Sequence, residues 1–359
     1  MKIIVVAGGQ GTKLWPYSRE SKPKQFQPIL GDKSPFTYNV ETLLRKYAPE
    51  DIFVSTKRKF IKYISEQAPQ IPLRNYIIEP DIKKDRGPAE GLAVLQLSLR
   101  HPDEPFMMVQ SDNVRQPEEE FLQFIEDAGS IVEREKKYVT GGIKANEADM
   151  GVDYLKLSEK VQHESNQEIY TVDEFIGRKP TFAETKKLVE SFHVVVHCNH
   201  TCWYPELFLD AYKQHRPDWY KALMEIKAAI GKPGEDKEIE RIYSEMAVGP
   251  TEDVTRHVMS HGIIILTKFK WIDFGTWGSL YEFFCDGGSN YADGNVVAVE
   301  STDSLIKTSN KDKLIAVAGV DNLVVVDTDD VLLIIPKNKI EKIKDIQKLL
   351  AADANQSYL

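Results

Sequence analysis

Residues 5–26 read VVAGGQGTKLWPYSRESKPKQF and combine the end of a strand, a glycine-rich turn and two groups of basic residues. The apolar run KIIVVA at residues 2–7 stops at the turn, and Lys24 lies in a second basic segment, KPKQF. Glycines let a backbone approach a ligand closely, and lysines supply positive charge. The stretch therefore predicts a phosphate-binding turn at the carboxyl end of a strand.

The bulk composition is that of an ordinary globular chain with an acidic balance. The 359 residues carry 46 basic and 55 acidic side chains, which gives a formal net charge of −9 at pH 7. Nucleic-acid-binding domains usually carry a basic excess, so we expect no nucleic-acid partner, although a small phosphate ligand needs only a local basic cluster. Three cysteines do not make a disulfide framework, and no apolar run approaches the length of a membrane span. We therefore expect a cytoplasmic protein with no membrane partner.

The first half of the sequence alternates between strand and helix patterns. Apolar runs at 2–7, 51–55, 75–80 and 105–112 are typical of buried strands, and helical patterns lie between them. This alternation predicts an α/β fold with a Rossmann-like, mostly parallel mixed sheet and helices on both faces. Ligands bind at the carboxyl ends of the strands in such sheets, where both the glycine turn and the segment QSD at 110–112 fall.

The pattern changes towards the carboxyl end of the chain. Residues 152–180 resemble paired strands, and helical patterns follow at 181–191 and 205–230. The last 75 residues hold short β-rich runs separated by Asn, Asp and Gly, and a basic amphipathic helix follows them. We place a domain boundary in the turn-rich segment CDGGSNYADG, which predicts a core at 1–285 and a small β-rich module with a terminal helix at 286–359.

The glycine turn by itself allows several interpretations. A Walker loop requires GxxxxGK[ST], but here the order is GTK with too few residues before it. A dinucleotide-binding loop requires GxGxxG, and Leu14 occupies the place of its third glycine. A plain strand–turn–helix loop, in which glycines only supply unusual backbone angles, stays open.

The whole block AGGQGTKLWPYSRESKPKQFQPI resembles the signature of the sugar-phosphate nucleotidylyltransferases, which is GGxGTRLxP followed by KPK. The Leu-Trp-Pro and SKPKQF spellings favour the mannose-1-phosphate guanylyltransferase family, and the segment KLIAVAGVDNLVVVDTDDVLLI resembles its C-terminal module. The resemblance implies nucleotidylyl transfer from GTP to α-D-mannose 1-phosphate, with GDP-mannose and pyrophosphate as products. It also implies that the C-terminal module is a short left-handed β-helix that helps to form a homodimer.

The resemblance assigns roles to residues around the nucleotide. The nucleotide-binding residues would be Gly8, Gly9, Gly11, Thr12, Lys13, Glu79 and Pro88. Lys13 would meet the leaving pyrophosphate, and Lys24 would steady charge near the α-phosphate. Relatives usually have arginine at position 13, so we expect weaker pyrophosphate binding here, because lysine lacks the bidentate fork of arginine.

A divalent metal and a sugar phosphate complete the site that the resemblance implies. Asp112 and Asp273, which resemble the aspartates of the motifs PADH and DxGTW, would hold Mg²⁺ and complete the catalytic set with Lys13 and Lys24. Lys179 would grip the sugar phosphate. The substrate-binding residues would be Gly151, Lys179, Asn199 and Asp273.

The chain departs from the family pattern where the base and the sugar are usually selected. Asp85, Arg86 and Gly87 stand where Asn-Thr-Ala is usual, Arg178 replaces a glutamate, and Asp153 replaces a glycine. Two alternatives therefore stay open. One is the same chemistry with another nucleoside triphosphate or hexose 1-phosphate, and the other is a non-catalytic regulator that binds nucleotide sugars on the same fold.

Overall fold

The computed structural model describes residues 1–9, 14–191, 193–285, 288–310, 312–352 and 355–359. Its contacts divide the chain into two compact units. Unit 1 consists of Met1–Gly8, Val40–Gln110 and Arg115–Lys270, and unit 2 of Gly9–Asn39, Ser111–Val114 and Trp271–Leu359. The predicted boundary between 1–285 and 286–359 falls at residues 286 and 287, which lie outside the described residues.

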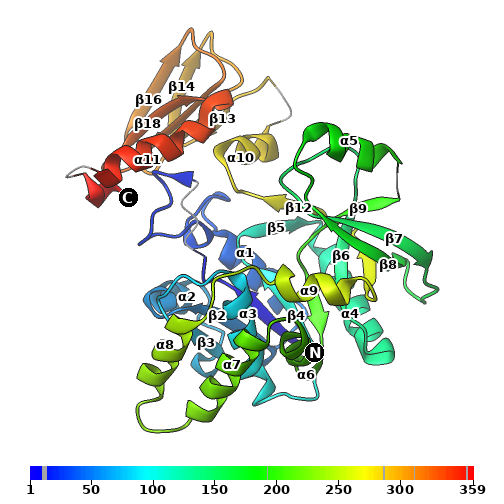
Figure 1. Cartoon of the computed structure of the whole chain (residues 1–359). Helices are drawn as coiled ribbons and strands as arrows, with labels where there is room; N and C mark the ends of the chain where they lie inside the picture. The colour runs from blue at the N-terminus through cyan, green and yellow to red at the C-terminus, as the bar shows by residue number, and fades with distance from the viewer. Residues whose placement is uncertain (10–13, 192, 286–287, 311, 353–354) are drawn as a thin grey trace. The chain divides into compact units, whose positions relative to one another are not determined.

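Unit 1 is built on a sheet that has ten strands among the described residues, in the order β11-β8-β7-β9-β6-β10-β4-β1-β2-β3 (Figure 1). The predicted parallel strands are present as β1 (Lys2–Val6), β2 (Ile52–Lys57), β3 (Tyr76–Glu79) and β4 (Phe106–Gln110). All their mutual pairings are parallel, which brings the ends of β1 and β4 together at the pair Val6–Gln110. The Rossmann-like mixed sheet is thus confirmed.

The other strands of this sheet are mostly antiparallel. They are β6 (Val139–Lys144), β7 (Tyr154–Lys160), β8 (Glu168–Gly177), β9 (Val194–His197), β10 (Thr201–Trp203) and β11 (Ile263–Leu266). The predicted paired strands at 152–180 are β7 and β8, which pair antiparallel with several shifts of register. Figure 1 shows them as a long hairpin. The parallel partner of β6 is β11, from a distant part of the chain.

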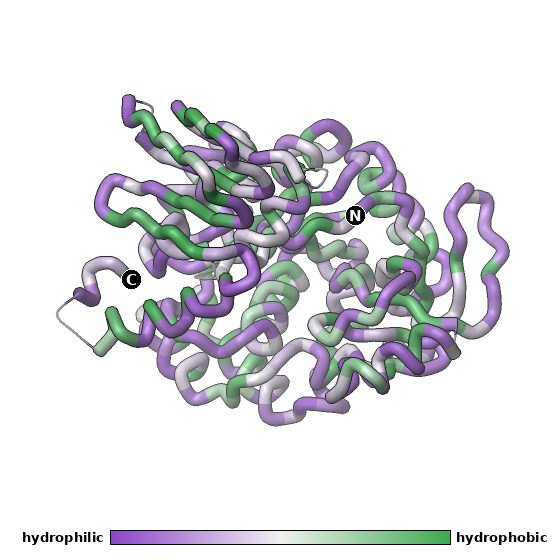
Figure 2. The backbone as a smooth tube through the Cα atoms, turned by 90° about the horizontal axis from the view of Figure 1, so that it is seen from above, coloured by the Kyte–Doolittle hydropathy of each residue, from purple (hydrophilic) through white to green (hydrophobic). Residues whose placement is uncertain are grey.

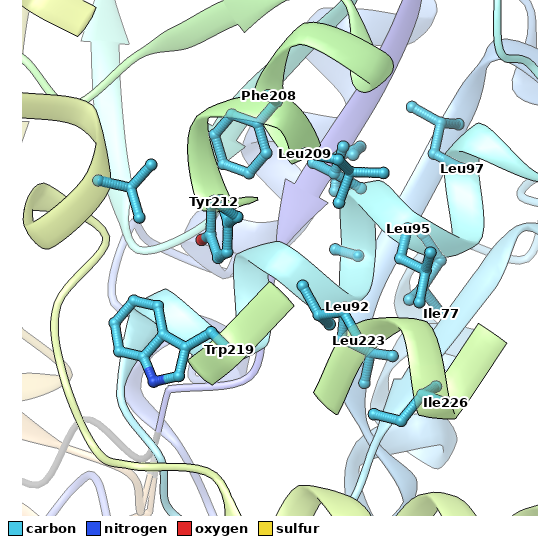
Figure 3. Packing of buried hydrophobic residues seen from close by; sticks show 14 of the residues in the cluster. Ile77, Leu92, Leu95, Leu97, Phe208, Leu209, Tyr212, Trp219, Leu223 and Ile226 are labelled. Carbon is cyan, nitrogen blue, oxygen red and sulfur yellow. The ribbon is translucent and has the colours of Figure 1, made fainter. Parts of the chain in front are cut away.

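Helices cover both faces of the sheet in unit 1. One face packs against α3 (Arg86–Ser98), α6 (Pro205–His215), α7 (Pro217–Ala229), α8 (Glu235–Glu245) and α9 (Glu252–Met259). Figure 3 shows this core, in which Leu92 and Leu95 of α3 lie near Ile77 of β3, Phe208 of α6 and Leu223 of α7. The other face carries α4 (Glu118–Glu135), which contacts β4, β6 and β10.

The helical pattern predicted at 205–230 proves to be two helices. Pro217 starts α7 directly after Arg216, because proline has no backbone N–H to continue the hydrogen bonds of α6 but fits the first turn of a helix. Two shorter helices of unit 1, α2 (Ile61–Gln67) and α5 (Phe182–Ser191), lie where the sequence predicts helix.

The C-terminal part of unit 2 forms two small sheets. Strands β13 (Tyr291–Asp293), β15 (Leu305–Thr308), β17 (Leu323–Asp327) and β18 (Leu332–Pro336) make one, and β14 (Asn295–Val299) and β16 (Leu314–Ala318) make the other. Successive strands alternate between the two sheets and pair in parallel up to β17, which is the winding of a β-helix. Helix α11 (Ile343–Ala352) follows, and Figure 2 shows the hydrophobic strands separated by hydrophilic turns.

The rest of unit 2 holds the segments that carry the candidate catalytic residues. A two-stranded sheet pairs β5 (Asn113–Gln116) with β12 (Lys270–Asp273), and α10 (Trp277–Phe284) follows β12. Helix α1 (Pro35–Leu44) begins in this unit. Trp277 is fully buried in the core and donates a hydrogen bond to the carbonyl of Trp15, which anchors the segment after the glycine turn.

Candidate active site

Lys24 lies between two carboxylates in unit 2. Its Nζ is 3.0 Å from Oδ2 of Asp112 and 3.2 Å from Oδ1 of Asp273. The lysine side chain is 5% exposed, whereas each aspartate side chain is 44% exposed. The ammonium group is therefore buried and the two carboxylates remain accessible to a ligand.

The charge state of Lys24 follows from this arrangement. Burial acts to lower the pKa of Lys24, but the charges of Asp112 and Asp273 and their hydrogen bonds outweigh it, so that the pKa is raised. The lysine is thus positively charged at neutral pH and offsets the repulsion between two adjacent negative groups.

Three different local structures present these side chains. Lys24 opens a short 3₁₀ turn after Pro23, Asp112 lies in the turn between β4 and β5, and Asp273 ends β12. The chain turns away after Asp273 because Thr276 caps α10, with its hydroxyl accepting from the backbone N–H of Ser279. Three distant segments thus meet at one point of unit 2, as the resemblance implies for Lys24 and the two aspartates.

Supporting side chains hold this cluster, and the sequence pattern did not reveal them. The buried amide of Asn39 donates to the carbonyls of Pro35, Asn113 and Ser111, at 2.8, 2.9 and 3.4 Å, and so fixes the turn that carries Asp112. Gln25 donates to the carbonyl of Gly9 at 2.7 Å. A lone amide in a helix pattern carries no signal of this role, because its partners come from distant segments.

Asn113 connects the same turn to Asp273. With its amide oriented to suit its neighbours, Asn113 donates to Oδ1 of Asp273 at 3.2 Å and accepts from Nε1 of Trp271 at 3.3 Å. The carboxylate of Asp273 is therefore oriented by both Lys24 and Asn113.

The donor set of this cluster suits a magnesium ion that also binds phosphate. Mg²⁺ is usually held by one or two carboxylates and takes phosphate oxygens and water for its other positions. In the described parts of the chain, His, Cys, Asp and Glu side chains do not gather in groups of three or more that could hold a metal. Asp112 and Asp273 therefore fit an ion that arrives with a phosphate ligand, rather than an all-protein metal cage.

Gly8 and Glu79 meet at the carboxyl ends of β1 and β3 in unit 1. A Cβ atom on Gly8 would lie 2.1 Å from Oε1 of Glu79, so only glycine fits without a shift of that buried carboxyl group. Burial raises the pKa of Glu79 to about 7, although Lys57 and the hydroxyl of Tyr243, which donates to it at 3.3 Å, both act to lower it. Gly8 and Glu79, two of the predicted nucleotide-binding residues, are thus in contact with each other.

The loop at 85–87, where the sequence departs from the family pattern, is held rigidly. Asp85 has a positive backbone φ of 67°, and its side chain accepts from the N–H of Arg86. The side chain of Arg86 pairs with Glu252. The N–H of Gly87 donates to the carbonyl of Gly249 at 3.0 Å. Pro88 is buried in the first turn of α3, directly after this loop.

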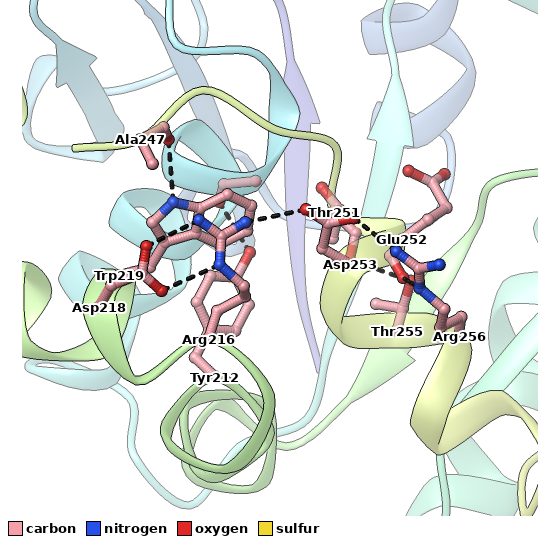
Figure 4. A network of polar contacts seen from close by, with 11 residues as sticks. Tyr212, Arg216, Asp218, Trp219, Ala247, Thr251, Glu252, Asp253, Thr255 and Arg256 are labelled. Atoms are coloured by element: carbon pink, nitrogen blue, oxygen red, sulfur yellow. Dashed lines mark hydrogen bonds and ion pairs between the residues drawn. The ribbon is translucent and has the colours of Figure 1, made fainter.

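A polar network fastens the segment around Gly249 to the helices beside it (Figure 4). The indole of Trp219 donates to the carbonyl of Ala247 at 2.9 Å, and Arg216 stacks on the indole ring at 3.4 Å. Thr251 donates to the buried carboxylate of Glu90 on α3 at 2.7 Å. Because this segment bonds to the 85–87 loop, the network sets the shape of that loop.

The three predicted sugar-side residues of unit 1 lie on loops at one corner of the sheet. Gly151 precedes β7, Lys179 follows β8, and Asn199, with φ of 53°, separates β9 from β10. The loops are brought together because Tyr154 of β7 pairs with Gly177 of β8 and with Val196 of β9. The predicted residues Gly11, Thr12 and Lys13 lie outside the described residues.

The histidines of the segment HCNHTC bond within the core of unit 1. His197 lies 2.9 Å from the hydroxyl of Thr140, and His200 accepts from Nε of Arg115 at 2.9 Å. The segment joins β9 to β10 through a turn at Asn199, which has a positive φ.

The fold and the cluster together define a chain of the nucleotidyl transferase class. A family model described as nucleotidyl transferase matches residues 2–290, and one described as a MannoseP isomerase/GMP-like beta-helix domain matches residues 294–350. The chain belongs to the nucleotidyl transferase family and carries a C-terminal β-helix domain of this second type.

Named relatives are similar over most of the chain. A mannose-1-phosphate guanylyltransferase of Salmonella muenchen is 29% identical over 313 residues, which cover 84% of this chain and 64% of the relative. The alginate biosynthesis protein AlgA of Pseudomonas syringae pv. tomato is 27% identical over 315 residues, covering 86% of this chain and 63% of the relative. The chain thus spans less than two thirds of the length of these relatives.

A solved structure shares the fold of the whole chain. A protein from Thermus thermophilus, described as a mannose-1-phosphate geranyltransferase, superposes with a TM-score of 0.83 at 23% identity, and the match covers 98% of this chain and 99% of that one. This likeness confirms the fold that the sequence predicts.

Proposed function

We propose that this protein transfers a guanylyl group from GTP to α-D-mannose 1-phosphate, giving GDP-mannose and pyrophosphate. The observation that carries the proposal is the convergence of Lys24, Asp112 and Asp273 from three distant segments into one accessible cluster. Membership of the nucleotidyl transferase family and the similarity to mannose-1-phosphate guanylyltransferases support the choice of reaction and substrates.

The chemistry requires positioning and charge neutralisation more than proton transfer. An oxygen of the sugar phosphate forms the new bond to the α-phosphorus of GTP, and the bond from that phosphorus to the leaving pyrophosphate breaks. No general base is needed, because the attacking phosphate oxygen is already ionised at neutral pH. Lys24 would offset negative charge near the α-phosphate, and backbone N–H groups of the glycine turn would hold the other phosphates.

Asp112 and Asp273 would hold Mg²⁺ in this reaction. When bound, the ion would polarise the α-phosphate and reduce the repulsion between two anionic substrates. Lys179 would bind the phosphate of the sugar and Asn199 its hydroxyl groups, since both lie on loops at one corner of the sheet in unit 1.

Pyrophosphate release from GTP, mannose 1-phosphate and Mg²⁺ tests the proposal directly. Asp112→Asn, which keeps the size of the side chain, should lower kcat by at least a hundredfold because it removes a metal ligand. Asp329→Asn, at an exposed turn, is the matched control and should leave kcat unchanged. Pyrophosphate release with other nucleoside triphosphates or hexose 1-phosphates, but not with GTP and mannose 1-phosphate, would show that the enzyme uses other substrates. Binding of GDP-mannose without any pyrophosphate release would favour the alternative of a non-catalytic regulator that binds nucleotide sugars.

An apolar face in the C-terminal module supports a homodimer. Val297 and Val299 of β14 are 49% and 55% exposed, and Leu314 of β16 is 54% exposed. Leu314 pairs with Asn295, which is two residues before Val297 in β14. Because side chains alternate between the faces of a strand, the side chains of Val297, Val299 and Leu314 lie on the same face of the two-stranded sheet. Exposed apolar sheet faces of this kind usually mark an interface, and we propose a second copy of the chain as the occupant.

Light scattering after size exclusion tests the dimer. Val297→Glu together with Val299→Glu should yield monomers, because burying the new charges in an interface is unfavourable. Leu349→Glu, at a side chain that is 72% exposed on α11, is the control and should leave the dimer intact. A wild-type monomer at micromolar concentration would exclude the homodimer.

We propose a cytoplasmic location for this enzyme. Cys198, Cys202 and Cys285 are free thiols, as expected in a reducing compartment. Among the described residues there is no helix long and apolar enough to cross a membrane. Fractionation of cells that express the full chain would test the location.

A further inference from the structure

We propose that unit 1 carries a second ligand site, for a phosphate ester that also bears hydroxyl groups, in a cavity along the edge strand β3. The cavity has a volume of about 600 Å³ and is lined by β3, the end of α3 and the start of α8. Figure 1 shows β3 at the end of the sheet with α8 beside it. Cavities of this size hold small organic ligands.

Two arginines define one end of the cavity. Arg74 precedes β3 and Arg100 follows α3, and Arg100 donates a hydrogen bond to the carbonyl of Arg74, so the two residues are neighbours. Neither forms an ion pair with any carboxylate in the described parts of the chain, whereas Arg58, in the same cavity, pairs with Asp236 at 3.1 Å. Burial lowers the pKa of Arg100, with no carboxylate to counter it.

This arrangement favours an anion. A guanidinium without a carboxylate partner gains most from a ligand that accepts several hydrogen bonds at once, and a phosphate group does so with two arginines. The arginine end thus binds the phosphate of the ligand.

Carboxylates also line the cavity, both at the end of β3 and on α8, where they are Glu235, Asp236 and Glu240. Glu79 ends β3 and Asp81 follows it, and both line the cavity. At roughly 3.3 Å per residue, the length of β3 separates these carboxylates from Arg74 by about 10 Å or more. Carboxylates repel a phosphate but accept hydrogen bonds from hydroxyl groups. Ile78, Ile239 and Leu99 add apolar side chains to the lining.

The cavity is made of unit 1 residues, whereas Lys24, Asp112 and Asp273 belong to unit 2 and do not line it. Of the predicted nucleotide-binding residues that the structure describes, Glu79 lines the cavity. The inference therefore goes beyond the proposed function, and a binding measurement can test it without turnover.

Isothermal titration calorimetry, with glucose 6-phosphate and with inorganic phosphate as probes, tests the site. The titrations use Lys24→Gln protein, which weakens phosphate binding at the catalytic cluster. We expect the Lys24→Gln protein to bind one glucose 6-phosphate per chain. When Arg74→Gln and Arg100→Gln are added to it, we expect the affinity for glucose 6-phosphate to fall at least tenfold. Arg58→Gln is the matched control, because that arginine is already paired, and should change the affinity less than twofold.

Two further measurements separate the contributions of the two ends. Asp81→Asn should weaken glucose 6-phosphate binding about threefold or more and leave inorganic phosphate binding unchanged. Should the double arginine variant fail to fold, Arg74→Gln alone, at an exposed side chain, should still weaken both probes. Absence of binding by the Lys24→Gln protein, or affinity that survives loss of both arginines, overturns the proposal.

Discussion

Arg178 and Asp153 form an ion pair, with Nε of the arginine 3.4 Å from Oδ1 of the aspartate. Both are positions at which the sequence resemblance implies another residue, glutamate at the first and glycine at the second. Their strands are neighbours, since Tyr154 of β7 pairs with Gly177 of β8. The two residues therefore bond to each other at one corner of the sheet, next to the loop that carries Lys179.

Arg178→Glu should disrupt the predicted sugar site. The new glutamate would repel Asp153, whose side chain is only 16% exposed, and would displace the loop that carries Lys179. We expect the KM for mannose 1-phosphate to rise at least tenfold, with less than a twofold change in the KM for GTP. The double variant Asp153→Gly and Arg178→Glu should recover most of the loss. Equal rises in both KM values would place this pair away from the sugar.

Lys24→Met removes the positive charge from the proposed catalytic cluster but keeps an unbranched side chain of similar length. The variant leaves two adjacent carboxylates without the lysine cation, which should lower the free energy of unfolding by about 1–2 kcal/mol, since both aspartates are partly solvated. Removing a donor near a reacting phosphate typically costs about 10²–10³ in kcat. Urea unfolding and pyrophosphate release measure the two effects.

Added Mg²⁺ supplies a second readout on the same variant. Because the carboxylates of Asp112 and Asp273 then lack the charge of Lys24, millimolar Mg²⁺ should raise the Tm of Lys24→Met more than that of the wild-type protein. An identical response to Mg²⁺ in both proteins would contradict the assignment of these aspartates as metal ligands.

Glu79 should make stability depend on pH. Its folded-state pKa of about 7 lies above the usual value, so the native state binds the proton more tightly than the unfolded state. Stability is therefore lost as the pH rises from about 4.5 to 7, by about 3 kcal/mol at most. Glu79→Gln removes this ionisation, and urea unfolding should show a gain over wild type at pH 8 and little difference at pH 4.5. If Glu79→Gln changed the free energy of unfolding equally at pH 4.5 and pH 8, the pH dependence would not arise from ionisation of Glu79.

Gly8→Ala should damage the glycine turn through Glu79. The added Cβ would lie 2.1 Å from the carboxylate oxygen, so the backbone or the buried side chain must move. We expect kcat/KM for GTP to fall at least tenfold. Adding Glu79→Ala removes the obstacle, so Gly8→Ala should lower the free energy of unfolding less in a Glu79→Ala background than in the wild-type protein. An equal loss in both backgrounds would trace the effect to the glycine backbone itself.

The sequence by itself determined the architecture and the family of the chain. Apolar runs of strand length between amphipathic helices predict the parallel sheet, because hydrophobic periodicity is a local property of the chain. The glycine turn and the motifs around Lys24, Asp112 and Asp273 are local patterns as well. Strands of three or four residues, such as β13 and β15, carry too little periodicity to have their bounds predicted from local patterns.

Only the tertiary structure decided which residues act together. The contact of Asn39 with the turn that carries Asp112, the contact of Asn113 with Asp273, and the pairing of Asp153 with Arg178 join segments that are distant in sequence. The raised pKa of Glu79 arises from burial by neighbours that its own segment does not specify. Such properties depend on distances through space, which strand pairing and core packing set and local sequence patterns do not encode.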